Sequence, residues 1–265
     1  MEKGIRICLG IIIVLIAPAL SGCIGADSIA KLGLNHGIPG GLTLACLDDT
    51  TYTSMVVEID YEPGYKPETT STEMLKERLE SVCDKPQGIE ILLTETDFEN
   101  NGIWYDSDVR TIGWEEKSHD PRDGSTLYWQ VLFPAGTYEV EESSVLGVAV
   151  DASTVSIFKD SIDEAENFIR RPSAEKIENS VIVHEIGHLL GLVNTVYTSP
   201  EPHEDSEHPG HSNNEDSVMY WAIESSNIAN IFGDNLPNEF DINDKNDLRG
   251  LADGSIPCTE QLWRP

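Results

Sequence analysis

The run from His184 to His188, His-Glu-Ile-Gly-His, constrains the fold of this 265-residue chain more than any other segment. Side chains four residues apart share one face of an α-helix, so His184 and His188 can offer two imidazoles to one metal ion if the segment is helical. Two imidazoles at this spacing are typical of catalytic zinc, and Glu185 would reach a water on the metal as a general base. The run therefore predicts a buried helix that carries a hydrolytic zinc site.

A catalytic zinc ion usually has three protein ligands and leaves its fourth position to water, so a third ligand is needed. Gly191 follows His188 by three residues and can adopt the left-handed conformation that ends a helix and turns the chain back toward the metal. Three residues further on stands Asn194, which is a poor zinc ligand. The third ligand is therefore expected downstream, and His203, His208 and His211 are the candidates beside Asn194.

The stretch from His211 to Tyr220 resembles the segment that matrixin-type metzincins, a group of zinc proteases, carry from their third zinc histidine to the methionine turn. It reads His-Ser, four variable residues, a small residue, an aliphatic one, then Met-Tyr. The resemblance implies that His211 is the third ligand, that Met219 packs beneath the metal, and that residues 193–210 are an insertion. The chain departs from the family at Asn194 and at Trp221, where matrixins have proline.

This resemblance covers residues 53–254, is strong at the zinc segment and loose elsewhere, and implies an α+β, zincin-like fold. Its parts are a mixed, mostly parallel twisted sheet, an antiparallel edge strand at residues 145–150, a last central strand at 154–158, the zinc helix at 173–192, and a small irregular C-terminal subdomain with a helix at 241–251. Periodicity predicts further strands at residues 55–61, 89–94 and 127–133 and a helix that begins with a capping box near Thr70. Residues 98–122 are expected to form a long polar loop.

The N-terminus has the features of a lipoprotein signal peptide over residues 1–22. Lys3 and Arg6 precede an apolar run at 7–20, and Leu-Ser-Gly leads to Cys23. The run is shorter than the roughly 20 apolar residues that a spanning helix needs, so an uncleaved anchor is the alternative. We expect an exported lipoprotein, anchored to the membrane at the cell surface through lipid on Cys23, with a tether at 23–50 and one catalytic domain at 51–265.

The composition is strongly acidic, with 47 Asp and Glu against 17 Lys and Arg and a net charge of -30. Such a surface repels nucleic acid, so no nucleic-acid partner is expected. Calcium is a further candidate cofactor beside zinc, in the acidic stretches 97–108 and 120–123, although neither matches an EF-hand loop. Cys46, Cys83 and Cys258 allow at most one disulfide, whose pairing cannot be deduced from the sequence.

These features predict a zinc-dependent endopeptidase that hydrolyses extended polypeptides. His184, His188 and His211 would hold Zn²⁺ and Glu185 would be catalytic, while the edge strand would pair with the substrate backbone. The alternative is a surface lipoprotein that binds or scavenges zinc, because five of the seven histidines lie between residues 184 and 211 around an acidic loop. A scavenger has no use for Glu185 or Met219, which favours the protease. The sequence specifies neither the substrate nor the oligomeric state.

Overall fold

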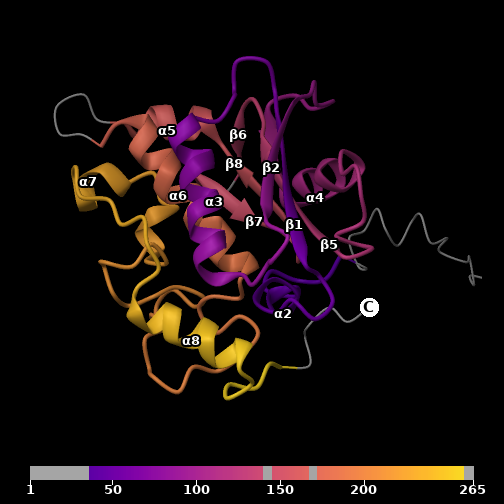
Figure 1. The fold of residues 1–265 in the computed structure, drawn as a ribbon. Helices are drawn as coiled ribbons and strands as arrows, with labels where there is room; N and C mark the ends of the chain where they lie inside the picture. The colour runs from indigo at the N-terminus through magenta and orange to yellow at the C-terminus, as the bar shows by residue number, and fades with distance from the viewer. Residues whose placement is uncertain (1–35, 140–144, 167–171, 260–265) are drawn as a thin grey trace, which may run out of the picture.

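The structure, a computed structural model, describes residues 36–139, 145–166 and 172–259. Its centre is a sheet whose strands follow the order β2-β1-β5-β8-β7 (Figure 1). The first four strands of this order are mutually parallel, and β7 runs antiparallel to β8 at one edge. The prediction of a mixed, mostly parallel sheet with an antiparallel edge strand is therefore confirmed. The strands are β1 (Ser54–Tyr61), β2 (Ile89–Glu95), β5 (Thr126–Phe133), β7 (Gly147–Ala149) and β8 (Thr154–Ile157), with β4 (Arg122–Asp123) beside β5 and a separate pair, β3 (Ile103–Trp104) and β6 (Thr137–Tyr138).

The central strands follow the predicted alternation of apolar side chains. In β1, Met55, Val57 and Ile59 enter the main core, and the carboxylates of Glu58 and Asp60 lie buried among polar partners. Each of the three strands predicted from periodicity begins within one residue of its predicted start. The edge strand is shorter than predicted, because the backbone N–H of Leu146 donates to the carbonyl oxygen of Glu224 in the C-terminal part of the chain.

Helices cover the sheet on its two faces (Figure 1). Helices α3 (Thr69–Val82) and α6 (Ala174–Leu189) pack against each other, and α6 also contacts β7 and β8. Helix α5 (Lys159–Ala165) precedes α6 and packs on it. Helix α3 begins one residue before the predicted capping box, and no side chain of the described residues caps it, so that cap was wrongly predicted.

The long loop predicted at residues 98–122 is wrong, because this segment contains helix α4 (Asp106–Glu115). Tyr105 and Asp108 form a capping box at its start, and Val109 belongs to a small second core. Gly113 brings the helix close to β8, since a β-carbon there would lie 2.5 Å from Cγ2 of Thr154. A helix that packs through glycine presents few apolar side chains, which is why its period is weak in the sequence.

The tether predicted for residues 23–50 is also too long. Residues from 36 onward are packed, and helix α2 (Thr43–Leu47) buries Cys46, which forms a disulfide with Cys83 at the end of α3. The folded domain therefore begins before residue 51. The predicted signal peptide and Cys23 lie outside the described residues. Among the described residues, no helix combines the length and the apolar character needed to cross a membrane.

The chain after Gly191 forms the small, irregular C-terminal subdomain that was predicted. Its helices are a 3₁₀ turn η1 (Trp221–Ile223), α7 (Ile228–Phe232) and α8 (Ile242–Ala252). Helix α8 follows Asp241, whose carboxylate accepts from the backbone N–H groups of Asn243 and Asp244. This cap fixes the start of α8, which packs against α2 and α3.

Candidate metal centre and active site

Helix α6 places His184 and His188 in its last turns and ends as the sequence predicts. Gly191 has a φ of 82°, and the N–H of Leu192 donates to the carbonyl oxygen of Gly187 at 3.0 Å, a closure typical of helix ends. A β-carbon at Gly191 would lie 2.8 Å from Oγ1 of Thr43 and 2.8 Å from Cγ2 of Val196. Both the backbone conformation and the packing therefore require glycine here.

The two helix imidazoles are held in one tautomer. Nδ1 of His184 lies 2.7 Å from the carbonyl oxygen of Val218, and Nδ1 of His188 lies 3.1 Å from that of Leu192. A carbonyl oxygen only accepts, so each Nδ1 carries the proton and donates it. The Nε2 lone pairs then face each other at 3.2 Å. Two lone pairs repel at this distance, whereas two nitrogen ligands of one tetrahedral zinc ion lie about 3.4 Å apart.

The protonation of these rings also suits a metal. Burial lowers the pKa of His184 to about 3 and that of His188 to about 4. Both imidazoles are therefore neutral at neutral pH, and a metal ion does not compete with protons for their nitrogens. Hydrogen bonds from Nδ1 to carbonyl oxygens are the outer contacts that orient metal-binding histidines.

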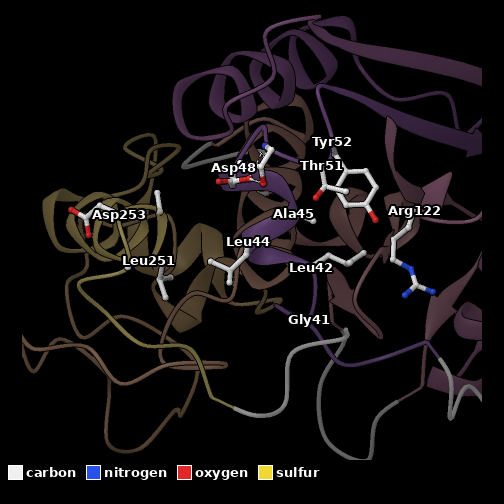
Figure 2. A pocket seen from close by; sticks show the side chains of 13 residues that line it. Gly41, Leu42, Leu44, Ala45, Asp48, Thr51, Tyr52, Arg122, Leu251 and Asp253 are labelled. Atoms are coloured by element: carbon white, nitrogen blue, oxygen red, sulfur yellow. Dashed lines mark hydrogen bonds between the residues drawn. The ribbon is translucent and has the colours of Figure 1, made fainter. Parts of the chain in front are cut away.

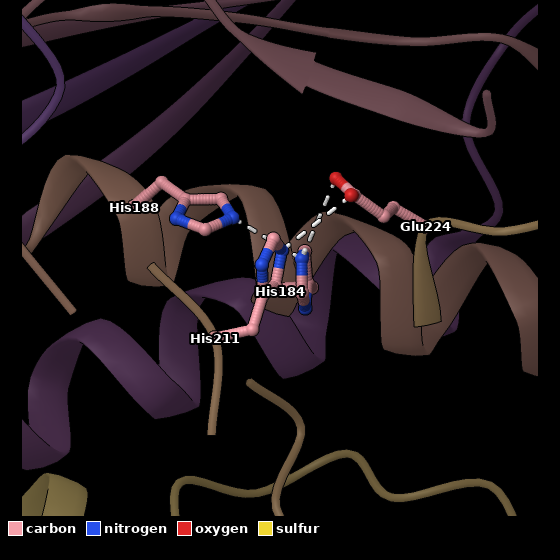
Figure 3. A group of neighbouring side chains, drawn as sticks. All are labelled: His184, His188, His211 and Glu224. Atoms are coloured by element: carbon pink, nitrogen blue, oxygen red, sulfur yellow. Dashed lines mark hydrogen bonds and ion pairs between the residues drawn. The ribbon is translucent and has the colours of Figure 1, made fainter. Parts of the chain in front are cut away.

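His211 reaches the same point from the far end of the insertion (Figure 3). Its ring centroid lies 5.2 Å from that of His184 and 5.0 Å from that of His188, and within the described part of the chain neither of its nitrogens has a hydrogen-bond partner. Backbone hydrogen bonds of 2.8 Å from Asp205 to His211 and from Asn213 to His203 align residues 203–205 antiparallel to 211–213. One donor atom each from His184, His188, His211 and Glu224 lies within 4.8 Å of the others. The structure thus brings the three predicted ligands together.

The three competing ligands lie elsewhere. Asn194 has a φ of 58° and holds the insertion, since its amide donates to Glu204 and its oxygen accepts from the N–H of Ser199. His208 lies 3.2 Å from Asp205 and its ring stacks on Trp221, and His203 contacts Asp247. Neither histidine belongs to the group around His184, and both polar atoms of the Asn194 side chain are engaged in the hydrogen bonds of the insertion.

Met219 packs beneath helix α6, as the methionine turn predicts. The side chain is fully buried, and a β-carbon on Gly187 would lie 2.1 Å from its sulfur. The glycine between the two histidines of the motif therefore leaves room for the methionine. The same turn supplies the Val218 carbonyl oxygen that orients His184, so the turn supports the metal centre through both packing and a hydrogen bond.

Glu185 is fully buried beside the imidazoles, and neither of its carboxylate oxygens has a hydrogen-bond partner among the described residues. Burial, together with the charge of neighbouring Glu224, raises the pKa of Glu185 well above its ordinary value. Glycine at position 147 of the edge strand makes room for the Glu185 side chain, because a β-carbon on residue 147 would lie 2.6 Å from Oε1 of Glu185. A buried, unpaired carboxylate with a raised pKa is what a general base near a bound water requires.

Glu224, just after η1, is the site residue that the sequence analysis missed. Its Oε1 lies 3.5 Å from Nε2 of His211, and its Oε2 lies 3.9 Å from Nε2 of His184 (Figure 3). Burial alone would raise the pKa of Glu224, but the facing imidazoles of His211 and His184 lower this pKa to about 2. Glu224 is therefore a carboxylate in position to contact the same metal ion.

A cleft of about 450 Å³ opens beside these groups. Its lining includes Glu185, His188 and Glu224, with Val148 and Ala149 of the edge strand on one wall and residues of the insertion on another. A second hollow of about 610 Å³ lies between α2 and the end of α8, and its lining contains none of the metal-centre residues (Figure 2). The smaller cleft is therefore the place where a substrate could reach the metal.

The donor set fits zinc. Three imidazole nitrogens that converge with free lone pairs, beside an unpaired glutamate, are the ligands and the base of a catalytic zinc site. The acidic stretches proposed for calcium contribute to neither group of candidate metal ligands among the described residues. Asp106 instead accepts from Tyr138, Asp108 caps α4, and Asp120 accepts from the N–H of Arg122. The calcium prediction thus has no support in the structure.

Comparison with known proteins identifies no family for the chain. No family model matches it, and no curated protein matches its sequence. Among solved structures, it resembles the crystal structure of archaemetzincin from Methanopyrus kandleri, with 12% sequence identity and a TM-score of 0.49 over 77% of this chain and 97% of that one. The assignment of metal ligands rests on the geometry of this chain's own residues.

Proposed function

We propose that this chain is a zinc-dependent endopeptidase. The observation that carries the proposal is the buried carboxylate of Glu185, which has no hydrogen-bond partner among the described residues, beside three imidazoles whose nitrogens converge on one point. A protein that only stores zinc needs the imidazoles and gains nothing from a buried glutamate without partners, which costs free energy. A catalytic role therefore explains why a glutamate is buried at position 185, whereas a role in stability does not.

His184, His188 and His211 would hold the zinc ion. When bound, zinc would supply Lewis acidity, which lowers the pKa of a water molecule and polarises the scissile carbonyl group. Glu185 accepts a proton from the attacking water at a carboxylate oxygen and later gives it to the nitrogen of the leaving amine. Its raised pKa suits both transfers, because a base that is too weak would not accept the proton at neutral pH.

The substrate class follows from the edge of the sheet. Strand β7 ends the described sheet, and Val148 and Ala149 face the cleft beside Glu185. An extended polypeptide can add to an exposed strand through backbone hydrogen bonds, which would carry its scissile bond past the metal. Recognition through the backbone favours unfolded or loosely structured polypeptides, whatever their side chains.

The test is cleavage of an unfolded polypeptide such as denatured casein by the full chain. We expect cleavage that a zinc chelator abolishes and that added zinc restores. The alternative function, zinc storage at the surface, predicts bound zinc without any cleavage. A chain that binds zinc stoichiometrically and cleaves none of a panel of unfolded polypeptides would exclude the peptidase.

We also propose that the chain is exported and anchored to a membrane through lipid on Cys23. The disulfide between Cys46 and Cys83 supports an oxidising compartment, since such bonds rarely persist in a reducing cytosol. Replacing Cys23 by serine should release the protein from the membrane fraction. Unchanged membrane association of that variant would point to an uncleaved N-terminal helix instead.

A further inference from the structure

A second group of metal-ligand side chains lies at the start of α8. His203, Asp241 and Asp244 each offer one donor atom, and these atoms lie within 4.8 Å of one another. His203 comes from the insertion and is 2% exposed, and Asp244 is completely buried. None of these residues takes part in the centre around His184.

Two polar atoms in this group face each other, and neither has a hydrogen-bond partner in the part of the chain that the structure describes. Nε2 of His203 lies 2.8 Å from Oδ2 of Asp247, and because an ionised carboxylate only accepts, Nε2 carries the proton. Nδ1 faces Oδ1 of Asp244 at 3.8 Å, and neither atom has a hydrogen-bond partner among the described residues. A shared proton would draw the two atoms to about 2.8 Å. Two ligands of one zinc ion, with bonds of about 2 Å, lie about 3.3–4 Å apart.

Three carboxylates surround His203, and their negative charges favour a bound cation. Asp244 and Asp247 are buried and Asp241 lies beside them, yet no lysine or arginine among the described residues forms an ion pair with any of the three. The nearby Lys245 pairs with Glu239 instead. Carboxylates that are removed from water require a counter-charge or a metal ion, so the described partners leave this group short of positive charge.

We propose that His203, Asp241 and Asp244 bind a second, structural zinc ion. Asp247 orients His203 from behind, as carboxylates do for metal-binding histidines. A nitrogen donor beside two carboxylates suits zinc, whereas calcium prefers six to eight oxygen ligands. The ion fastens the insertion, through His203, to the start of α8.

The second ion also supports the first centre. Oγ of Ser217 donates to Oδ2 of Asp244 at 2.6 Å and accepts from the N–H of Met219 at 3.0 Å. The residue between them, Val218, supplies the carbonyl oxygen that orients His184. The segment that carries His203 also pairs with the segment that carries His211. The two metal centres are therefore joined by two short connections, one through the side chain of Ser217 and one through the backbone pairing of the insertion.

The test is the zinc content of the full chain, with the first centre removed to isolate the second. We expect two zinc ions per chain in the parent and one in the double variant His184→Ala, His188→Ala. Adding His203→Ala or Asp244→Asn to the double variant should remove the remaining ion. Adding His208→Ala should leave it, because His208 is a histidine of the same insertion that pairs with Asp205 outside the group.

Circular dichroism checks that each variant is folded. A more conservative variant gives a second test through its zinc affinity. Asp247→Asn keeps the shape of the side chain and loses the carboxylate behind His203, so zinc affinity of the second site should fall about 10- to 100-fold. A parent with one zinc ion, or a double variant with none, overturns the proposal. The proposal is also overturned if the triple variant with His203→Ala is folded and keeps a zinc ion, or if Asp247→Asn leaves the zinc affinity of the second site unchanged.

Discussion

The backbone N–H of Leu146 donates a hydrogen bond of 3.0 Å to the carbonyl oxygen of Glu224. This bond ties the edge of the sheet to the turn after Met219, so the two walls of the cleft are fixed to each other across the metal centre. The side chain of Glu224 is 33% exposed and faces His211 and His184. Its position makes Glu224 a fourth side chain around the metal, where a catalytic zinc ion usually keeps a place for water.

Replacing Glu224 by alanine should therefore open the fourth position. We expect zinc affinity to fall about 10-fold or more, since a charged neighbour of the metal is lost, and cleavage at saturating zinc to be at least as fast as in the parent. Zinc titration and cleavage rates on the same preparation measure the two effects. If cleavage is lost while zinc stays bound, Glu224 instead contacts the substrate.

Replacing Glu185 by glutamine should abolish cleavage and leave zinc bound. Glutamine has the same shape but cannot accept the proton, and general base catalysis typically contributes about 10²- to 10⁴-fold to the rate. Metal content and cleavage of an unfolded polypeptide are measured together. Equal rates for variant and parent would exclude the proposed mechanism.

Replacing Gly147 by alanine should slow cleavage about 10- to 100-fold without loss of zinc. The added β-carbon would lie 2.6 Å from Oε1 of Glu185, and the flexible carboxylate is the group that can move away. A displacement of about 1 Å of a catalytic group can cost about 100-fold in rate. Ser156→Ala is the control, because Ser156 lies on the neighbouring strand β8 and outside the lining of the cleft, and it should leave Glu185 in place. Equal effects of the two substitutions would contradict this role of Gly147.

Replacing His211 by alanine should remove both the catalytic zinc and the activity, because two protein ligands are too few for this kind of site. His208→Ala, in the same insertion, should keep both, since His208 contacts Asp205 and Trp221. The measurements are metal content and cleavage rate. Loss of the catalytic zinc in His208→Ala, with retention in His211→Ala, would show that the wrong histidine was assigned.

The metal-free protein should lose stability in mild acid. Burial lowers the pKa of His184 to about 3 and that of His188 to about 4, compared with about 6.5 in an unfolded chain. Between these values the unfolded chain binds protons that the folded chain does not, so the free energy of unfolding falls as the pH drops from about 6.5 toward 4. Urea unfolding at pH 7 and pH 4.5 measures the decrease in the free energy of unfolding between the two pH values. In the double variant His184→Asn, His188→Asn this decrease should be smaller by on the order of 1–3 kcal/mol. Identical pH dependence in parent and variant would contradict it.

The sequence predicted the parts of the site that local spacing specifies. His184, Glu185 and His188 share one helix turn, and Gly191 ends that helix as expected. His211 could be selected because it stands at a fixed distance from Met219, although the insertion hides its distance from His188. Glu224 was missed because it follows Trp221, where the resemblance to matrixins breaks, and because one glutamate among 47 acidic residues carries no positional signal.

The fold was predictable to a similar extent. The strands with alternating apolar residues were found, whereas α4 and α2 were missed for physical reasons. Helix α4 approaches β8 through Gly113 and so has a weak apolar stripe, and α2 is only five residues long and is fixed by the pairing of Cys46 with Cys83. Contacts between residues distant in the sequence determine both elements, and no local pattern contains them.

The antiparallel pairing of residues 203–205 with residues 211–213 gives the five residues between them, 206–210, an unusual constraint. Surface loops generally tolerate changes of length, but successive side chains of paired segments point in opposite directions. A deletion of one residue within 206–210 would shift the register and turn either His203 or His211 away from its present neighbours. For this stretch of chain, the number of residues therefore matters more than their identity.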